Sequence, residues 1–412
     1  MPATFGGTVS VRRVACVGLV AAATLLGACS SDDGSDEGSA SMATTVDDRP
    51  DAPRIEEFAG SVEEFYRVPD PLPEGEAGDV LRTMPIEAPE GSTGHRIMYL
   101  TTDGDDDLRA ATGTVYVPDA EAPEDGWPIV AWAHGTSGLA AKCAPSRNPS
   151  PPPDHGIEGV RVSADYLGLG PEGELHPYLQ SVAEGHAVID AVAAARSMPE
   201  AHAGDEWVVV GVSQGGHAAL VTNEMAAERL PEAELVGAAA LAPGAELSTD
   251  YGDLLQIRVI TTMALVGAAA EDPDIVLDRY LSPPVRSAAA AIETGCVGDV
   301  ITAMAPLAAA PDYFLVDPRA DPVGQAWLEE NNPGKVVGAA PLLLVQGGAD
   351  VLVVPARTQA LFERLCGIGQ TVQMIDVPTA DHDTVVDESV TEVGAWLRAR
   401  LAGEPATDDC PS

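Results

Sequence analysis

The sequence predicts an α/β fold, in which a mostly parallel sheet has helices on both faces and carries an inserted helical cap. Three observations support this prediction. Six short apolar runs alternate with helix-compatible stretches, as expected for buried parallel strands in β–α order. At residues 207–229 a strand-like run enters a glycine-rich turn that leads directly into a helix. Residues 248–335 interrupt the alternation with alanine, apolar residues and prolines.

The first 28 residues have the features of a bacterial export signal. Arg12 and Arg13 precede an apolar segment, residues 14–26, that is too short to span a membrane. The signal ends in Leu-Gly-Ala followed by Cys29, the pattern at which bacterial lipoproteins are cleaved and lipidated. We therefore expect acyl chains on Cys29 to anchor the mature protein to a membrane surface. An ordinary cleaved signal with an incidental cysteine is the alternative.

Residues 29–60 are predicted to form a disordered acidic tether, because they are rich in serine, glycine, alanine and aspartate and lack apolar periodicity. The signal contributes two arginines and residues 30–60 a net charge of −7, so residues 61–412 carry −37 within the total of −42. Such an acidic surface repels phosphate backbones, so nucleic acid is not expected as a partner. An acidic substrate is disfavoured for the same reason.

Residues 61–412 have the length of one α/β domain with an insertion. Its first elements are expected to be a hairpin of two extended runs, residues 95–100 and 112–117. The aspartates between these runs fit a solvated turn better than a calcium loop. An EF-hand frame begun at Asp103 meets Leu108 and Thr114 where it needs glycine and glutamate.

Six further strands are expected at residues 128–133, 159–162, 207–210, 235–240, 342–345 and 372–377. Helices are expected within residues 178–196 and 215–229. Right-handed crossovers would place the carboxyl ends of these strands at one edge of the sheet, where ligands bind. We interpret residues 248–335 as a helical cap over that edge, with a helical side layer that has no gating role as the alternative.

The turn Gly211-Val212-Ser213-Gln214-Gly215-Gly216 has the form of a nucleophile elbow. Such a turn exposes the serine oxygen at the edge of the sheet, and glycines at 211 and 215 avoid collisions with the neighbouring backbone. A plain glycine-rich turn is the alternative in a chain with 41 glycines. We predict Ser213 as a nucleophile because the rest of the chain completes the pattern.

A serine oxygen becomes reactive when a histidine accepts its proton and an acid orients that histidine. Asp350 follows the strand expected at 342–345, and His382 follows the last strand, which matches the chain order serine, acid, histidine. Asp381 and Asp383 flank His382, but adjacent side chains rarely point at one another. The other histidines precede Ser213 or, like His217, lie in the helix of the elbow.

The oxyanion that forms during acyl transfer needs two hydrogen-bond donors. The N–H of Gln214, directly after Ser213, is the expected first donor. The loop after residues 128–133 is positioned to supply the second from Thr136 or Gly135. A plain glycine turn is the alternative for this loop.

Four cysteines remain beyond the signal and Cys29, namely Cys143, Cys296, Cys366 and Cys410. In an oxidising compartment this even number suggests two disulfides, and spacing alone allows three pairings. Metal binding is the weaker interpretation, because no CxxC motif or histidine cluster accompanies the cysteines.

Several motifs together resemble the secretory lipases, the fungal lipase A-like branch of the α/β-hydrolase fold. They are Gly211-Val212-Ser213-Gln214-Gly215-Gly216, His134-Gly135-Thr136, Asp165-Tyr166-Leu167-Gly168-Leu169-Gly170, His176-Pro177-Tyr178-Leu179, Gly348-Ala349-Asp350 and His382. The resemblance runs from about Arg96 to the C-terminus. It implies Ser213, Asp350 and His382 as the catalytic residues, a cap in the insertion, and disulfides between Cys143 and Cys296 and between Cys366 and Cys410.

These observations lead to the hypothesis of an exported, membrane-tethered serine ester hydrolase or lipase that acts on a small-molecule or lipid ester. The chemistry requires no metal or organic cofactor. A serine peptidase or acyltransferase with the same triad, and a lipoprotein that binds lipid without catalysis, are the alternatives. The acyl chain length and the oligomeric state are left open by the sequence, with a monomer as the simpler expectation.

Overall fold

The structure is a computed structural model that describes residues 54–249, 254–307 and 309–411. The predicted export signal, Cys29 and most of the predicted tether therefore lie outside the described residues. No helix in these three ranges is both long enough and apolar enough to cross a membrane.

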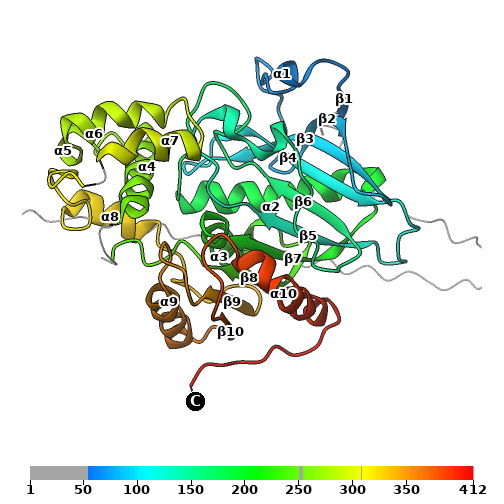
Figure 1. Cartoon of the computed structure of the whole chain (residues 1–412). Helices are drawn as coiled ribbons and strands as arrows, with labels where there is room; N and C mark the ends of the chain where they lie inside the picture. The colour runs from blue at the N-terminus through cyan, green and yellow to red at the C-terminus, as the bar shows by residue number, and fades with distance from the viewer. Residues whose placement is uncertain (1–53, 250–253, 308, 412) are drawn as a thin grey trace, which may run out of the picture. The chain divides into compact units, whose positions relative to one another are not determined.

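The fold is built on a ten-stranded sheet with the order β1-β2-β3-β4-β6-β5-β7-β8-β9-β10 (Figure 1). The strands are β1 (Glu56–Glu57), β2 (Val80–Ile86), β3 (Ser92–Thr102), β4 (Leu108–Pro118), β5 (Trp127–Ala133), β6 (Val160–Ala164), β7 (Ala203–Val212), β8 (Glu234–Leu241), β9 (Leu342–Gly347) and β10 (Val372–Val377). Strands β2, β3, β4 and β6 pair antiparallel, whereas β6, β5, β7, β8, β9 and β10 form a continuous parallel run. The mostly parallel sheet and the β3–β4 hairpin are thus confirmed.

Two strands at one end of the sheet, β1 and β2, were not predicted from the sequence. Strand β2 contains a proline and the buried Arg82, which mask the apolar alternation typical of a strand. The Arg82 guanidinium lies over the Phe58 ring at 5.2 Å and pairs with Glu56 at 3.5 Å. Because Glu56 and Glu57 pair with β2, the ordered fold begins before residue 60, where the tether was expected to end.

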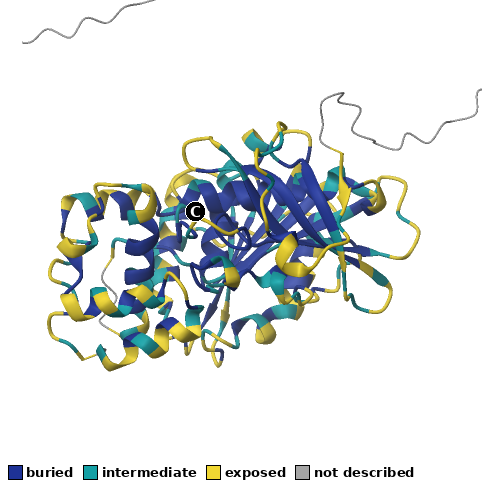
Figure 2. Cartoon of the chain, turned by 90° about the horizontal axis from the view of Figure 1, so that it is seen from above, coloured by how far each residue is buried: buried dark blue, intermediate teal, exposed yellow. Residues whose placement is uncertain are grey.

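Helices cover both faces of the sheet, as predicted. The helices are α1 (Val62–Phe65), α2 (Ser181–Ser197), α3 (Gln214–Arg229), α4 (Leu255–Glu271), α5 (Leu277–Tyr280), α6 (Pro283–Ala288), α7 (Val297–Met304), α8 (Pro322–Glu330), α9 (Pro355–Ile368) and α10 (Val385–Leu401), with short 3-10 turns at Ala141–Cys143, Pro145–Arg147, Pro199–Ala201, Ala289–Ala291 and Ala305–Leu307. On β7, Trp207 and Val209 share one core with α2, α3 and α9, while Val208 and Val210 share another with α10. The alternation along buried strands therefore gives two cores, and Figure 2 shows the sheet as largely buried.

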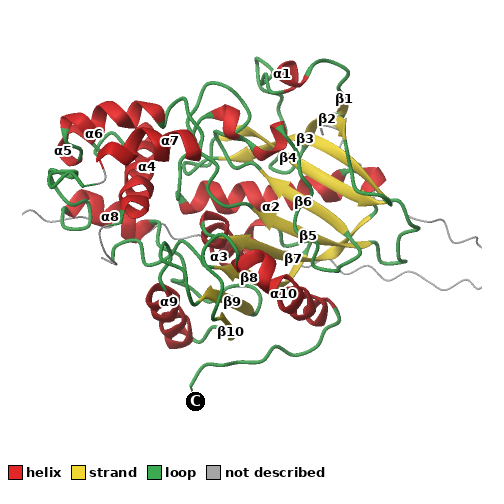
Figure 3. Cartoon of the chain, in the orientation of Figure 1, coloured by secondary structure: helices red, strands yellow, loops and turns green. Residues whose placement is uncertain are grey.

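The stretch between β8 and β9 is helical, as expected for the insertion. It contains α4 to α8, and Figure 3 shows this group of helices beside the sheet. Its described residues form no strand, although isolated bridges join Leu281 to Phe314 and Gly138 to Cys296. Met263, Tyr280, Ile292 and other apolar side chains give these helices a core of their own. The insertion is therefore a packed subdomain rather than a long loop.

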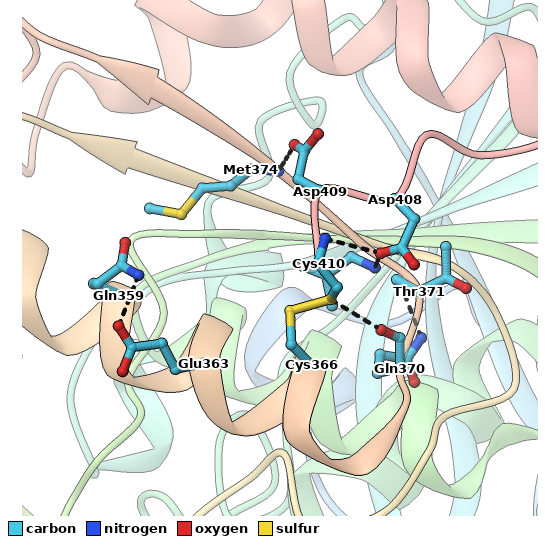
Figure 4. Close-up of a disulfide and its surroundings, with 10 residues drawn as sticks. Gln359, Glu363, Cys366, Gln370, Thr371, Met374, Asp408, Asp409 and Cys410 are labelled. Atoms are coloured by element: carbon cyan, nitrogen blue, oxygen red, sulfur yellow. Dashed lines mark hydrogen bonds between the residues drawn. A yellow bond between two sulfur atoms is a disulfide. The ribbon is translucent and has the colours of Figure 1, made fainter. Parts of the chain in front are cut away.

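A disulfide attaches the C-terminal tail to helix α9, beside the edge of the sheet (Figure 4). Cys366 on α9 is bonded to Cys410 in the tail, with a Cα–Cα distance of 5.4 Å. The carboxylates of Asp408 and Asp409 accept hydrogen bonds from the backbone of the edge strand β10 at Val372 and Met374. The tail thereby satisfies N–H groups that an exposed edge strand would leave unpaired.

Replacing Cys366 and Cys410 together with serine should lower the free energy of unfolding by about 2–5 kcal/mol, because the disulfide restricts the unfolded chain. Activity well below the melting temperature should not change, since this disulfide lies at the amino end of β10. Thermal unfolding followed by circular dichroism, beside an esterase assay at 25 °C, measures both quantities. An unchanged melting temperature would contradict this account of the tail.

Candidate active site

Ser213 lies at a sharp turn between β7 and α3. Its backbone has φ 59° and ψ −116°, a conformation that costs energy for any residue with a side chain. Backbone hydrogen bonds hold the turn, from the Ser213 N–H to the Leu241 carbonyl and from the Gly244 N–H to the Ser213 carbonyl, each at 2.9 Å. The turn is therefore a strained strand-to-helix junction fixed by the neighbouring strand.

Glycine is required on both sides of this serine. A Cβ atom added to Gly211 would overlap the Gly215 carbonyl oxygen, and one added to Gly215 would overlap the Ala133 carbonyl oxygen. Each clash involves backbone atoms, which cannot move aside without disturbing the sheet. These close approaches are the physical reason for the glycine pattern of the elbow.

Asp350 and His382 are directly hydrogen-bonded. The distance from Asp350 Oδ2 to His382 Nδ1 is 2.7 Å, and the Asp350 side chain is fully buried while that of His382 is 17% exposed. The other oxygen of Asp350, Oδ1, accepts the backbone N–H groups of Leu352 and Val353 at 2.8 Å each. The carboxylate is thus oriented by its own loop, which leaves Oδ2 to face the imidazole.

The loops that carry this pair meet because their backbones are bonded to each other. The Gly348 N–H donates to the Val377 carbonyl at 2.9 Å, and the Ala349 N–H donates to the Ala380 carbonyl at 3.0 Å. Both loops follow parallel neighbouring strands, β9 and β10, so they leave the sheet at the same edge. The contact between distant residues therefore follows from strand order.

The competing aspartate beside the histidine has other partners. Asp381 Oδ1 accepts hydrogen bonds from the backbone N–H groups of Asp383 and Thr384 at 3.1 and 3.0 Å.

Among the residues that the structure describes, no hydrogen bond joins Ser213 to His382. In hydrolases without substrate this contact is often long and shortens when substrate binds.

The loop that follows β5 approaches Ser213. A Cβ atom added to Gly135 would lie 3.8 Å from the Ser213 Cβ. Next to it, the Thr136 side chain is held by a 2.7 Å hydrogen bond between its Oγ1 and the Tyr178 hydroxyl. Gln214 is buried and begins helix α3. The structure thus brings both predicted donor segments to the same serine.

A cavity opens beside Ser213 and Gln214. Its volume is about 730 Å³, including the solvent-filled mouth. One wall is the face of α4 that carries Ile257, Ile260 and Ala264, which are spaced three and four residues apart. Leu352 and Val353, in the loop after β9 that orients Asp350, also line the cavity, so it lies between the helical insertion and the sheet edge.

A disulfide links the loop after β5 to the insertion. Cys143 is bonded to Cys296, which immediately precedes α7. The Val297 N–H also donates to the Ser137 carbonyl at 2.9 Å. Both disulfides in the structure therefore have the pairing that the family resemblance implied.

No group of three or more potential metal-ligating side chains occurs in the described part of the chain.

Comparison with known proteins identifies the family. A model of the secretory lipase family matches residues 156–409, which is more than half of the chain. The chain belongs to the secretory lipase family. A Mycobacterium tuberculosis relative described as a probable inactive lipase is 23% identical over 391 residues, covering 86% of this chain and 85% of that protein.

Solved structures agree on the fold of this secretory lipase family member. Candida antarctica lipase A in its closed state matches with a TM-score of 0.69 at 15% identity, over 85% of this chain and 89% of that one. A rice cell wall degrading esterase from Xanthomonas oryzae matches with a TM-score of 0.67 at 21% identity, over 79% of this chain and all of the other. The fold is therefore the α/β-hydrolase fold.

A buried polar cluster behind the elbow of this family member was not predicted from the sequence. Glu184 on α2 and His217 on α3 are both fully buried, and Glu184 Oε2 lies 2.7 Å from His217 Nδ1. The Nε2 of His217 faces the Asn331 carbonyl at 2.8 Å, so both ring nitrogens donate and the imidazole is positively charged. The detectable signal was a lone glutamate within the apolar run of α2.

The charges of this pair support each other. Burial by itself would lower the pKa of His217, but the adjacent Glu184 carboxylate raises it above its usual value. Burial would likewise raise the pKa of Glu184, but His217 and the hydrogen bonds to the carboxylate lower it. His176 lies nearby, and burial lowers its pKa to about 4, which keeps it neutral.

The pair should stabilise the fold most between pH 4.5 and 6.5, the usual pKa values of the two groups. His217 has a raised pKa, so its contribution is complete below 6.5 and is lost as the pH rises through the folded-state value. Glu184 has a lowered pKa, so its contribution is lost as the pH falls through that lower value. The test compares wild type with the neutral double variant Glu184→Gln, His217→Gln. The difference between their melting temperatures should be largest near pH 5.5 and should become smaller towards pH 9. A pH-independent difference would contradict the assignment of charge.

Proposed function

We propose that this protein is an exported serine ester hydrolase in which Ser213 is the nucleophile, His382 the general base and Asp350 the acid that orients it. The observation that carries the proposal is the 2.7 Å hydrogen bond between Asp350 Oδ2 and His382 Nδ1, formed at the same sheet edge as the strained Ser213 turn. Family and fold independently support hydrolysis of esters.

In the first half of the reaction, Ser213 Oγ attacks the ester carbonyl carbon while His382 Nε2 accepts the hydroxyl proton. The carbonyl oxygen becomes an anion that accepts hydrogen bonds from the Gln214 N–H and from an N–H of the Gly135–Thr136 loop. Collapse breaks the bond to the leaving alcohol, which takes the proton from His382. An acyl-serine ester remains on the enzyme.

Water completes the cycle by the same steps. His382 accepts a proton from water, whose oxygen attacks the acyl carbon of the serine ester. The second tetrahedral intermediate releases the carboxylic acid and returns the proton to Ser213. Asp350 fixes the Nδ1–H tautomer of His382 and stabilises the imidazolium that forms.

The apolar face of α4 in the cavity suits the acyl part of a substrate. Hydrophobic contacts along Ile257, Ile260 and Ala264 would bind an acyl chain. We infer that residues 248–335 act as the cap of this site. We also infer export through residues 1–28 and anchoring through lipid on Cys29, in agreement with two disulfides in the fold.

One relative is described as a probable inactive lipase, so we keep a second candidate function, the binding of a lipid without catalysis. In that case the cavity would retain a fatty acid, and Ser213 would not react. A serine peptidase or acyltransferase would instead form the acyl-serine but transfer the acyl group or cleave amides faster than it hydrolyses esters.

Two measurements on the purified protein test the proposal. A fluorophosphonate probe should label the wild type, and p-nitrophenyl esters from acetate to palmitate should be hydrolysed with a preference for one chain length. Absence of both labelling and turnover, with a fatty acid retained on the protein, would reject the enzyme in favour of lipid binding. Faster transfer to an added alcohol than to water would favour the acyltransferase.

A further inference from the structure

Both proposed oxyanion donors are tied to one short segment, residues 176–184, whose Tyr178 and Leu179 also line the cavity. On one side, the Tyr178 hydroxyl shares a 2.7 Å hydrogen bond with Thr136 Oγ1. On the other side, the side-chain amide of Gln214 lies 2.6 Å from His176 Nε2 and 2.7 Å from Glu184 Oε1. Loops after two different strands are thus tied to the same piece of chain.

Glu184 is the centre of this arrangement. Its Oε1 accepts hydrogen bonds from the Leu179 N–H at 3.0 Å and from Gln214, while its Oε2 pairs with His217. A carboxylate only accepts hydrogen bonds, so Gln214 must present its NH2 group to it. The second hydrogen of that group then faces the unprotonated Nε2 of His176, whose Nδ1 donates to the Leu167 carbonyl.

We propose that Glu184 is a positioning residue for the oxyanion hole. It fixes Gln214 directly, and it fixes Thr136 through the Leu179 backbone and the neighbouring Tyr178. Oxyanion donors act only when held to within about 0.5 Å of the required position, and small displacements reduce the rate strongly. Glu184 contacts none of the reacting atoms, so its effect is indirect. The inference rests on the proposed ester hydrolysis.

The chain offers a matched control on the same helix. Asp190 on α2 is also a buried carboxylate, and it pairs with Arg229 on α3, as Glu184 pairs with His217. Its other partner is the Thr101 hydroxyl on β3, so it has no link to the oxyanion loops. Asp190→Asn therefore reproduces the loss of a buried charge pair between α2 and α3 without disturbing the donors.

Glu184→Gln should lower kcat for the best p-nitrophenyl ester about 10- to 100-fold with KM within twofold, because the oxyanion forms only in the transition state. The rate of fluorophosphonate labelling should fall in parallel. Asp190→Asn should keep kcat within threefold, even at an equal loss of melting temperature. The positioning role would be overturned by a folded Glu184→Gln protein with unchanged kcat, or by equal losses of kcat in both variants.

A milder pair of variants decides the question if Glu184→Gln does not fold. Tyr178→Phe removes only the hydroxyl that contacts Thr136, and Tyr99→Phe removes a buried hydroxyl bonded to the Ala187 carbonyl on α2. We expect a 3- to 30-fold loss of kcat for Tyr178→Phe and no loss for Tyr99→Phe, and equal values would overturn the proposal. Wild-type turnover and labelling in the same assay test the proposed function separately.

Discussion

Ser213→Ala should abolish fluorophosphonate labelling and reduce ester turnover by about 10⁴- to 10⁶-fold, the largest effect expected for any substitution in this protein. The alanine methyl group cannot attack the carbonyl carbon, so no acyl-enzyme forms. The remaining oxyanion donors and the cavity would still bind substrate, so KM should change little. Labelling read by gel fluorescence and turnover of p-nitrophenyl esters give the two measurements.

A serine elsewhere in the fold provides the control. Ser389 on α10 is also buried, and its hydroxyl donates to the Val385 carbonyl at 2.6 Å. Ser389→Ala should keep its labelling and its turnover. Labelling that persists in Ser213→Ala would remove the assignment of the nucleophile.

Asp350→Asn should reduce kcat by about 10³- to 10⁴-fold, the second largest expected effect. The amide oxygen would keep the hydrogen bonds from the Leu352 and Val353 backbone, because those donors require an acceptor. The amide NH2 would then face His382 Nδ1 and force the proton onto Nε2. In that tautomer His382 cannot accept the proton of Ser213, although the fold is preserved.

Asp381→Asn is the matched control, because Asp381 is the immediate neighbour of His382 and its side chain caps the backbone of Asp383 and Thr384. Its amide oxygen can accept the same hydrogen bonds, so kcat should stay within threefold. If Asp381→Asn proved as damaging as Asp350→Asn, the acid of the site would have been assigned to the wrong loop. Initial rates at saturating ester measure both variants.

Local sequence patterns predicted most of the sheet. Strands β5, β7, β8 and β9 are largely buried runs rich in apolar residues, and β6 and the half-buried edge strand β10 also carry apolar residues, so each was recognisable without knowledge of its neighbours. Strand β2 was not predicted, because it contains Arg82, whose partners lie outside the strand. Residues 56–58 supply the carboxylate and the aromatic ring that surround the Arg82 guanidinium. A buried charge becomes compatible with a strand only when its partners are known.

The same limit applies to the cluster behind the elbow. Glu184 and His217 are separated by a strand and two loops, and neither residue by itself indicates the other as its partner. Their pairing depends on α2 and α3 lying side by side, which the contact between them establishes. The positioning role proposed for Glu184 could therefore come only from the structure.

Chemistry confined to a few consecutive residues was determined by the sequence alone, because a strand, a tight glycine turn and a helix are consequences of local backbone sterics. The glycines around Ser213 belong to this class, and the chain order of the serine, acid and histidine candidates can also be read directly from the sequence. Only the tertiary structure decided which carboxylate faces His382, how the cysteines pair, and what supports the oxyanion loops. Those outcomes depend on strand order and on helix packing, which bring together residues that have no local relation in the chain.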